Sequence, residues 1–423
     1  MAEIEPVPSE IKADTLVVGG GVAGITTAIE TAEIGRQVIL LERQPSLGGR
    51  VASMNQYFPK LCPPSCGIEI NLKRIRINPH IRVMTLAEVE KISGSAGNYE
   101  VTIKLSPRFV NEKCTACGDC AKVCEIERDN DFNYGMDKTK AIYLPHLMAY
   151  PCRYVVDPQY AADELMKKCA EACQYGAIDL DMQPQTITAK VGAIVWATGW
   201  KPYDAAKIEN LGFGSVPNVI TNVMMERLAS HNGPTEGKIQ RPSDGKELKS
   251  VGFVQCAGSR DDNHLPYCST ICCMASMKQA TYVREQYPDA EIHLFYIDVR
   301  SPGRWEDFYV KMQQDEKMHF HRGKVAKIVD NNGNPVLHAE NTLTGKITET
   351  EVDLAILATG MVPNTADEPP PVETTRDDFG FMVSEPTDGL IGAGTVVRPV
   401  DVSASIQDAT GAALKAVTAG ARR

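Results

Sequence analysis

The stretch from residue 15 to residue 42, TLVVGGGVAGITTAIETAEIGRQVILLE, constrains the fold of this chain more than any other. The apolar residues 16–18 predict a buried strand and residues 37–41 a second one, with a helix between them that extends to about Ile34. Three glycines stand where the first strand turns into the helix: Gly19, Gly21 and Gly24. This order predicts one β-α-β unit of an α/β domain.

The spacing of these glycines is typical of a domain that binds a dinucleotide. Gly19 permits a tight turn, Gly21 lets the backbone approach a pyrophosphate, and Gly24 lets the helix pack against its strand. The helix N-terminus then faces the phosphates with free N–H groups. Glu42 follows Gly24 by eighteen residues, where a carboxylate can accept both hydroxyls of an adenosine ribose. We therefore expect a dinucleotide site along this unit.

A second glycine pair indicates which dinucleotide it is. Arg43, Gly48, Gly49 and Arg50 follow Glu42 closely. A glycine pair beside an arginine at this distance resembles the flavoprotein version of the fold, in which an extended FAD lies across the loop. We expect these residues at an FAD site.

Two apolar strands that end in Ala-Thr-Gly, at residues 193–199 and 355–360, agree with this interpretation. They resemble the strand that closes over the flavin side in flavoproteins with two dinucleotide domains. Thr198, Gly199 and Gly360 are therefore expected at the cofactor.

Residues 389–417 predict a further strand, a glycine turn and an Ala-rich helix that begins near Val402. A helix N-terminus aimed at the N1/O2 edge of a flavin would stabilise the negative charge of the reduced ring. We add Gly394, Thr395 and Ser403 to the expected FAD site.

Composition excludes several classes of function. The formal net charge of −10 argues against nucleic acid as a partner. No run reaches the ~18 apolar residues of a membrane span, and the first residues, MAEIEPVPSEIKAD, lack the basic and apolar regions of a signal peptide. We expect a cytoplasmic protein, in which thirteen cysteines indicate metal or redox chemistry rather than structural disulfides.

Residues 107–183 differ in composition and are expected to form an inserted, ferredoxin-like iron–sulfur segment. Its C-x2-C-x2-C-x3-C run consists of Cys114, Cys117, Cys120 and Cys124. Three thiolates at this spacing can bind three corners of a cubane, whereas zinc sites pair two short knuckles, so the run favours [4Fe–4S]. The fourth cysteine of such a run ligates the other cluster in two-cluster ferredoxins.

The fourth ligand of the first cluster is expected further along the segment. Residues 169–178, CAEACQYGAI, resemble the end of the second ferredoxin half, with glutamine where proline is usual. One cluster is then held by Cys114, Cys117, Cys120 and Cys173. Cys124 and Cys169 would face a second site, for which Cys152 is the remaining third ligand; the alternative is that these three thiols are simply buried.

Cys62 and Cys66 form a separate pair, with Pro63 and Pro64 between them. The two thiols can form a redox disulfide, ligate a cluster or simply pack. The prolines argue against a regular helical turn between them.

A second dinucleotide-type domain is expected to begin with the strand VGFVQC at Val251 and to continue with EIHLFYID at 291–298. The glycine fingerprint is absent. Four cysteines stand near its place: Cys256, Cys268, Cys272 and Cys273. They are too many for packing alone, and adjacent cysteines make a strained disulfide. We expect an unusual [4Fe–4S] cluster where NAD(P)H would bind; the alternative is a vicinal disulfide with two buried thiols.

This combination resembles the A subunit of heterodisulfide reductase, which has an FAD domain of thioredoxin-reductase type, an inserted ferredoxin-like segment and a C-x11-C-x3-C-C set. Four stretches are closer still to the A subunit of the quinone-interacting membrane-bound oxidoreductase: NQYFPKLCPPSCGIEIN, FNYGMDKTKAIYLPH, IVWATGWKPYDA and FVQCAGSRDDNHLPYCSTICCM. The similarity extends over essentially the whole chain. It implies a soluble protein bound to two partners, an iron–sulfur flavoprotein and a membrane haem protein of the same complex. Such a protein passes electrons between the quinone pool and adenylylsulfate reductase in sulfur metabolism.

We therefore expect an α/β, thioredoxin-reductase-like electron-transfer flavoprotein, an oxidoreductase subunit without a general acid or base. FAD-binding segments are expected at 1–106, 184–245 and 346–423, the iron–sulfur insert at 107–183, and a degenerate nucleotide domain at 246–345. Two clusters are expected and a third stays open, in a cytoplasmic homodimer or heterodimer that associates with the membrane through its partners. The alternatives are a flavin subunit of heterodisulfide-reductase type, a pyridine-nucleotide disulfide reductase that uses Cys62 and Cys66, and a flavoprotein that only scaffolds a complex.

Overall fold

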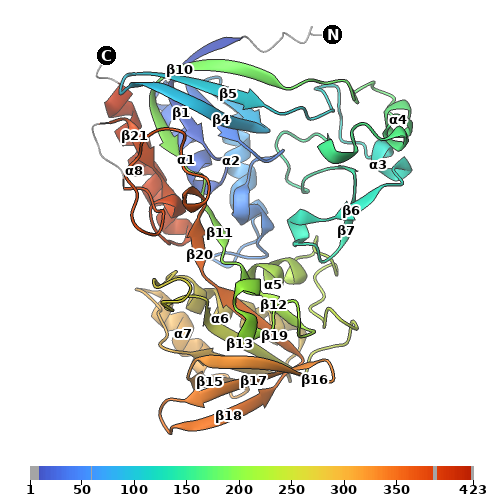
Figure 1. Cartoon of the computed structure of the whole chain (residues 1–423), viewed down its shortest axis with the longest axis vertical. Helices are drawn as coiled ribbons and strands as arrows, with labels where there is room; N and C mark the ends of the chain where they lie inside the picture. The colour runs from blue at the N-terminus through green and yellow to red at the C-terminus, as the bar shows by residue number, and fades with distance from the viewer. Residues whose placement is uncertain (1–8, 59, 384–387, 421–423) are drawn as a thin grey trace. The chain divides into compact units, whose positions relative to one another are not determined.

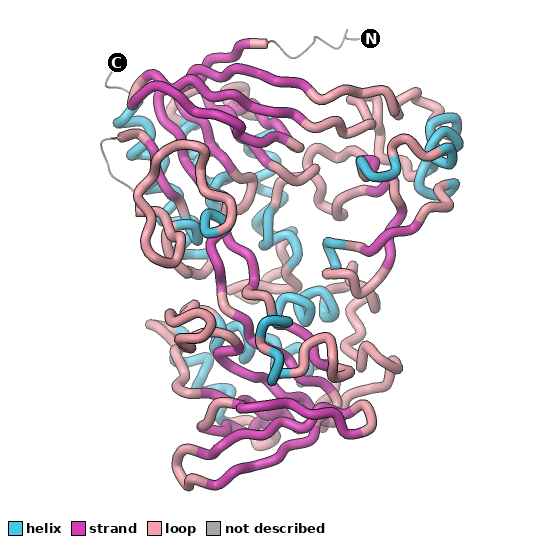
Figure 2. The backbone as a smooth tube through the Cα atoms, in the orientation of Figure 1, coloured by secondary structure: helices cyan, strands magenta, loops and turns pink. Residues whose placement is uncertain are grey.

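The computed structural model describes residues 9–58, 60–383 and 388–420 (Figures 1 and 2). The chain divides into two compact units, the first made of the residues up to Trp200 and from Pro363 onward, the second of Lys201–Val362. These units differ from the expected segments, because 201–245 and 346–362 belong to the second unit instead of the FAD domain. The reason is strand pairing, since Leu354–Thr359 joins the sheet of the second unit.

The first unit is built on one sheet with the strand order β3-β2-β1-β10-β5-β4, and β21 also pairs with β10. Its strands are β1 (Glu10–Val18), β2 (Val38–Glu42), β3 (Ile81–Thr85), β4 (Ala87–Ser95), β5 (Asn98–Leu105), β10 (Gln185–Trp196) and β21 (Leu390–Gly392). The central pairs β1–β2, β2–β3, β1–β10 and β10–β21 are parallel, whereas β5 pairs antiparallel with both β10 and β4. The expected strands of the glycine unit and at 98–105 are confirmed.

Three helices of this unit share an apolar core with the sheet: α1 (Val22–Glu33), α2 (Ser65–Ile77) and α8 (Val402–Gly420). Ile25, Ala28, Ile29 and Ala32 of α1 are buried at helical spacing, so one face of the helix covers β1. The Ala-rich face of α8 lies close to α1 and β10 because alanine permits a close approach (Figure 1). The residues at 389–392 and the helix start at Val402 agree with the sequence prediction.

The insert forms a small body of short elements beside this sheet. They are α3 (Asp119–Val123), β6 (Glu127–Asp129), β7 (Lys138–Lys140), β8 (Ile142–Tyr143), β9 (Val155–Val156) and α4 (Glu164–Glu171). The buried Arg108 ties the insert to the sheet by donating to the carbonyl oxygen of Pro45 and to Thr85 Oγ1 at 2.8 Å. Burial lowers the pKa of Arg108 to about 10, which still leaves it charged at neutral pH.

The second unit contains a parallel sheet of order β12-β19-β13-β14-β15 and a separate antiparallel sheet of order β16-β17-β18. Its strands are β12 (Val219–Thr221), β13 (Ser250–Ala257), β14 (Glu291–Tyr296), β15 (Met318–Arg322), β16 (Val325–Asn331), β17 (Asn334–Asn341), β18 (Lys346–Glu351) and β19 (Leu354–Thr359). Its helices are α5 (Asn222–Ala229), α6 (Cys272–Gln286) and α7 (Trp305–Gln313). The antiparallel sheet packs on the parallel one through Val254, Phe295 and Leu337. The two strands β11 (Trp200–Pro202) and β20 (Met361–Pro363) pair where the chain passes between the units.

No helix among the described residues is long and apolar enough to cross a membrane.

Candidate cofactor sites

The glycine turn of the first unit has the geometry of a pyrophosphate cradle. Gly19 has a φ of +111° and donates its N–H to Leu41 O at 2.8 Å. A Cβ on Gly24 would lie 1.8 Å from Gly19 O, so only glycine lets α1 begin so close to the turn. A Cβ on Gly21 would meet only Gly49 Cα, at 3.9 Å. Among the described residues, no other atom outside the adjoining backbone lies within 4 Å of that position. The N-terminus of α1 beside it has no capping side chain and no acidic residue in its first turn.

Glu42 lies at the end of β2 beside this turn, and both its oxygens accept backbone hydrogen bonds. Gly20 N–H donates to Oε2 at 2.6 Å and Gln44 N–H to Oε1 at 2.7 Å. Burial raises the pKa of the Glu42 carboxyl, while these two N–H groups lower it. A carboxylate has about four acceptor positions, so lone pairs remain for the hydroxyls of a ribose.

The second glycine pair lies directly against the first turn. Gly48 N–H donates to Gly20 O at 2.8 Å, and a Cβ on Gly49 would lie 2.8 Å from Gly21 Cα. Arg50 follows in the loop and donates to Trp200 O at 2.6 Å and to Tyr134 Oη at 3.1 Å. The loop is thus brought to the cradle as expected, but the Arg50 side chain also connects it to the insert.

The other expected FAD residues of this unit fall into two groups. Thr198 and Gly199 lie beside the turn at Gly394 and Thr395, since a Cβ on Gly199 would lie 3.8 Å from Thr395 Oγ1. Thr198 Oγ1 is buried and has no hydrogen-bond partner among the described residues, which fits a ligand contact.

Arg43 and Ser403 lie in exposed positions. Arg43 is ion-paired with Glu368. Ser403 is the second residue of α8, whose N-terminal turn is capped by Asp401 Oδ1 accepting from Ala404 N–H at 2.7 Å. This carboxylate already satisfies part of the helix end that we expected to face a flavin, so contacts of Arg43 and Ser403 with FAD stay predictions.

Gly360 requires a correction, because the structure places it in the second unit. It follows β19, and a Cβ there would lie 2.2 Å from Ser259 Oγ and 3.0 Å from Ser269 Oγ. Both serines line the cavity of the four cysteines described below. Strands that end in Ala-Thr-Gly occur in the sheets of both units. The prediction from this motif therefore placed Gly360 in the first unit, whereas it belongs to the second.

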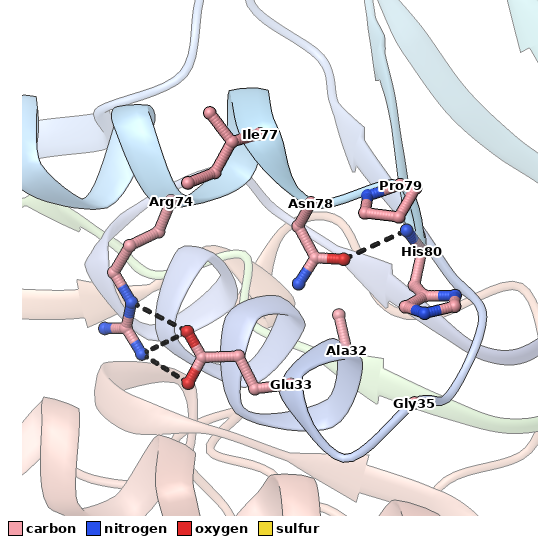
Figure 3. Close-up of a pocket in the computed structure, with 8 residues that line it drawn as sticks. All are labelled: Ala32, Glu33, Gly35, Arg74, Ile77, Asn78, Pro79 and His80. Atoms are coloured by element: carbon pink, nitrogen blue, oxygen red, sulfur yellow. Dashed lines mark hydrogen bonds and ion pairs between the residues drawn. The ribbon is translucent and has the colours of Figure 1, made fainter.

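A pocket at the opposite end of α1 lies away from this chemistry (Figure 3). Its empty volume is about 660 Å³, and Arg74 in its wall is paired with Glu33 at 2.9 Å. Because α1 has twelve residues, this pocket is about 18 Å along the helix from the glycine turn. Its arginine is already neutralised, so the pocket offers little to a phosphate.

In the insert, the structure brings Cys114, Cys117, Cys120 and Cys173 together. Burial raises the pKa of the Cys120 thiol to about 12, and the charges of Cys114, Cys173 and Cys117 raise it further. Ala116 N–H donates to Cys114 Sγ, and Ala177 N–H to Cys173 Sγ, both at 3.4 Å. Backbone N–H bonds to cysteine sulfur help set the potential of an iron–sulfur cluster, so the set fits the expected cubane.

The three remaining cysteines of the insert are arranged differently. Cys124 and Cys169 are buried and in contact, and each thiol donates to a backbone carbonyl, at Ile126 O and Leu165 O respectively, both at 3.6 Å. Burial, followed by the charge of Cys124, raises the pKa of Cys169 to about 12. Cys152 is exposed. Buried thiols that donate to carbonyls fit the packing interpretation of this pair.

The four cysteines of the second unit line one cavity with an empty volume of about 290 Å³. Cys256 is the next-to-last residue of β13, Cys272 and Cys273 open α6, and Cys268 lies in the connection between them. The carboxyl end of a parallel strand and the start of the next helix are where such folds bind ligands. The cysteines therefore occupy the place of the nucleotide.

The backbone around this cavity is strained. Three non-glycine residues of its lining, Cys256, Arg260 and Thr270, have positive φ angles of 57°, 55° and 59°. The left-handed conformation of Thr270 lets its N–H donate to Cys268 Sγ at 3.3 Å. Such strain persists where the surrounding structure fixes it, and it concentrates at functional sites.

Burial disfavours the charged form of three of the four thiols in this cavity. Burial, followed by the charge of Cys273, raises the pKa of Cys256 to about 11, and the pKa values of Cys272 and Cys273 are raised mainly by burial. Asp298, after the end of β14, stands where an acid would hold a ribose, but it is paired with Arg260. Ser259 Oγ is buried in the cavity wall with no partner among the described residues.

Neither set of cysteines is arranged as a single-ion site. In the described parts of the chain, no three His, Cys, Asp or Glu side chains surround one point as metal-ion ligands. In a cubane each cysteine binds a different iron atom, so its four ligands need not converge. All thirteen cysteines lie in the described residues and none forms a disulfide, so the structure does not contain the vicinal disulfide of our alternative.

Sequence reasoning missed several residues at these sites. Tyr154, whose hydroxyl lies 3.2 Å from the position of a Cβ on Gly118, stands beside the first cysteine set. Ser259, Arg260 and Asp298 line the second set. Of these, only Asp298 had a usable signal, because an acid after the second strand of a dinucleotide unit is itself a recognised position.

Comparisons with known proteins agree with this geometry. The family described as "FAD dependent oxidoreductase" matches residues 14–60. The second iron–sulfur A subunit of CoB–CoM heterodisulfide reductase from Methanopyrus kandleri is 39% identical over 99% of this chain. The A subunit of the H2:CoB–CoM heterodisulfide, ferredoxin reductase from Methanothermobacter marburgensis is 36% identical over 98%. The chain spans 66% and 65% of the length of these two relatives.

Solved structures agree on the fold. Thioredoxin reductase of T. acidophilum matches with a TM-score of 0.53 and 13% identity, over 96% of this chain and 98% of that one. Thioredoxin reductase of Lactococcus lactis matches with the same TM-score and identity, over 97% and 100%. This chain therefore has the fold of the thioredoxin-reductase-like FAD oxidoreductases, and its homologues matched at 33–39% identity are A subunits of CoB–CoM heterodisulfide reductase.

Proposed function

We propose that this chain is the FAD and iron–sulfur electron-transfer subunit of a complex of the quinone-interacting membrane-bound oxidoreductase type. It passes electrons between the membrane quinone pool and a cytoplasmic partner, adenylylsulfate reductase. Two further proteins, an iron–sulfur flavoprotein and a membrane haem protein, complete the complex and hold this chain at the membrane surface. The observation that carries the proposal is the cavity of Cys256, Cys268, Cys272 and Cys273 at the nucleotide position.

Each cofactor has residues suited to hold it. The cradle at Gly19, Gly21 and Gly49 would receive the pyrophosphate of FAD, and Glu42 its ribose. Cys114, Cys117, Cys120 and Cys173 would hold one [4Fe–4S] cluster, and the four cysteines of the second unit another. Bound FAD supplies two-electron chemistry and the clusters supply one-electron transfer.

The residues at the nucleotide position argue against a nicotinamide donor. A pyrophosphate at β13 would need a glycine turn with exposed N–H groups, but the turn offers the buried Cys256 thiol. Asp298 is paired with Arg260, so fewer of its acceptor positions are available to a ribose. In the proposed function, electrons enter through iron–sulfur partners instead of NADH or NADPH.

Anaerobic mixing tests this route. Oxidised protein with excess NADH or NADPH should keep its flavin absorbance for minutes, whereas reduced adenylylsulfate reductase should bleach it. Cys268→Ser, at a half-buried position, should abolish the bleaching by reduced adenylylsulfate reductase, while the flavin content is retained. Bleaching by NADH within seconds would contradict the proposal and favour a disulfide-reductase function. No response to the reduced enzyme would contradict the assignment of the partner.

A further inference from the structure

Cys62 and Cys66 form a close pair that neither expected cluster uses. Cys66 N–H donates to Pro63 O at 3.1 Å, and Tyr57 N–H donates to Cys62 O at 3.0 Å. These bonds hold Cys62 next to Tyr57 and Cys66 next to Pro63 where α2 begins, and the two thiols lie within hydrogen-bonding contact. The sequence argument that no regular helical turn joins them agrees with the start of α2 at Ser65.

The two thiols have different environments. Cys66 is exposed and is the second residue of α2, so its sulfur is accessible from solvent. No acidic residue stands in this first turn. Cys62 is half-buried, and the hydrogen bond with Cys66, followed by burial, raises its pKa. Cys66 is thus the better placed nucleophile, with Cys62 next to it as a protonated partner.

Tyr57 closes the site on one side. Its hydroxyl lies 2.3 Å from the position that a Cβ on Gly67 would take, so glycine is required for the ring to sit on the first turn of α2. Burial and then the charges of Cys66 and Cys62 raise the pKa of Tyr57. A neutral phenol therefore remains next to the thiols at neutral pH.

The pair belongs to a well-fixed part of the flavin unit. Ile68, Leu72 and Ile75 of α2 are buried in the same core as Ile25 and Ile29 of α1. The helix start that carries Cys66 is therefore held by packing, while its first turn stays open to solvent. A fixed, accessible thiol with a neighbouring thiol is the arrangement that disulfide exchange requires.

We propose that Cys62 and Cys66 are a thiol–disulfide exchange site for organic disulfides. The Cys66 thiolate attacks one sulfur of a disulfide RSSR, forming a Cys66–S–S–R mixed disulfide and releasing RS⁻. The Cys62 thiol then loses its proton to solvent and attacks Cys66 Sγ, which releases the second RS⁻ and forms a Cys62–Cys66 disulfide. Two electrons pass from the cysteine pair to the substrate. The site is independent of the proposed electron-transfer function, because neither cysteine is assigned to a cluster.

The test uses the anaerobic holoprotein and the aromatic disulfide 5,5′-dithiobis(2-nitrobenzoic acid) as probe, with released nitrothiobenzoate followed by absorbance. Wild type should release two equivalents from this pair in one fast phase, and peptide mass spectrometry should find a Cys62–Cys66 disulfide without a retained adduct. Cys62→Ser should release one equivalent and keep a nitrothiobenzoate adduct on Cys66. Cys66→Ser should slow the fast phase by about tenfold or more, since the exposed nucleophile is gone.

Cys152→Ser is the matched control, because Cys152 is also exposed but belongs to another segment. It should leave the Cys62–Cys66 disulfide and the fast phase unchanged. An adduct retained on Cys66 in wild type, or equal fast phases in wild type and Cys66→Ser, would overturn the proposal. Flavin absorbance checks that each variant is folded. The iron content reports on the clusters separately, so failure of this site is distinguishable from failure of the electron-transfer proposal.

Discussion

Replacing Gly21 with alanine should weaken FAD binding without unfolding the protein. Gly21 has a φ of −78°, which alanine adopts without strain. The added Cβ would meet only Gly49 Cα, at an ordinary contact distance of 3.9 Å. The new methyl group therefore projects into space that no described protein atom fills, where we place the pyrophosphate.

The structure gives the size of the effect. A displaced pyrophosphate loses at least one hydrogen bond from a backbone N–H to a charged oxygen, worth about 1.5–3 kcal/mol. This corresponds to a roughly 10- to 150-fold increase in Kd. The stability of the apoprotein should change by less than about 1 kcal/mol, the usual scale for an N-cap position.

Two other glycines separate the ligand effect from a structural one. Gly24→Ala places a Cβ 1.8 Å from Gly19 O, so α1 must move and the apoprotein should lose about 1–3 kcal/mol or more. Gly411→Ala, in α8 with no atom within 4 Å of its Cβ, should bind FAD normally and be stabilised by up to about 1 kcal/mol.

The assay is titration of each apoprotein with FAD, followed by flavin fluorescence, together with thermal unfolding of the apoproteins. An FAD affinity of Gly21→Ala within twofold of wild type would refute the placement of the FAD pyrophosphate next to Gly21. Loss of thermal stability equal to that of Gly24→Ala would show that the position is structural.

Three further predictions follow from the cysteine and histidine sites. Cys117→Ser should remove the signal of one cubane from the low-temperature electron paramagnetic resonance spectrum. The flavin spectrum should stay intact, because Cys117 is exposed in the insert. Loss of the cluster signal together with the flavin spectrum would mean that the insert is not a separate module. Ser259→Ala should leave the apoprotein equally or more stable, because the buried Ser259 hydroxyl has no partner among the described residues. The same change should shift the reduction potential of the cluster in the second unit. An unchanged reduction potential would place the hydroxyl away from that cluster. Burial, then the charges of His321 and His319, lower the pKa of His293 from 6.5 to about 4, so the unfolded chain binds this proton more tightly. Stability should be full above about pH 6.5 and fall by at most about 3 kcal/mol toward pH 4, less as solvent screens the ring. His293→Asn should flatten that dependence in urea titrations, and an unchanged slope would contradict the shift.

The glycine unit could be predicted from sequence because local constraints determine it. Gly19 and Gly24 are required by the backbone itself, through a positive φ and a close contact with a carbonyl oxygen. Glu42 sits at a fixed distance along the chain from them. Patterns of this kind depend on residues close in the sequence, so they can be recognised without knowledge of the tertiary fold.

Gly360 and the segment boundaries could not be predicted in the same way. The strands before Thr198 and before Gly360 have nearly the same letters, and only long-range pairing shows that β10 joins β1 while β19 joins β13. The left-handed conformations of Cys256, Arg260 and Thr270 carry no sequence signal, because none of them is glycine. The roles of Ser259 and Tyr154 depend on burial beside distant cysteines, which only the folded chain reveals.

The most direct test of the central claim is iron and acid-labile sulfide per chain in anaerobically purified wild type and Cys268→Ser. Cys268 is half-buried and its sulfur accepts one backbone N–H, so the substitution should preserve the fold and the bound flavin. We predict that the variant contains about four iron and four sulfide fewer than wild type, as loss of one [4Fe–4S] cluster requires. Equal iron and sulfide in the two proteins, at equal flavin content, would contradict a cluster at the nucleotide position.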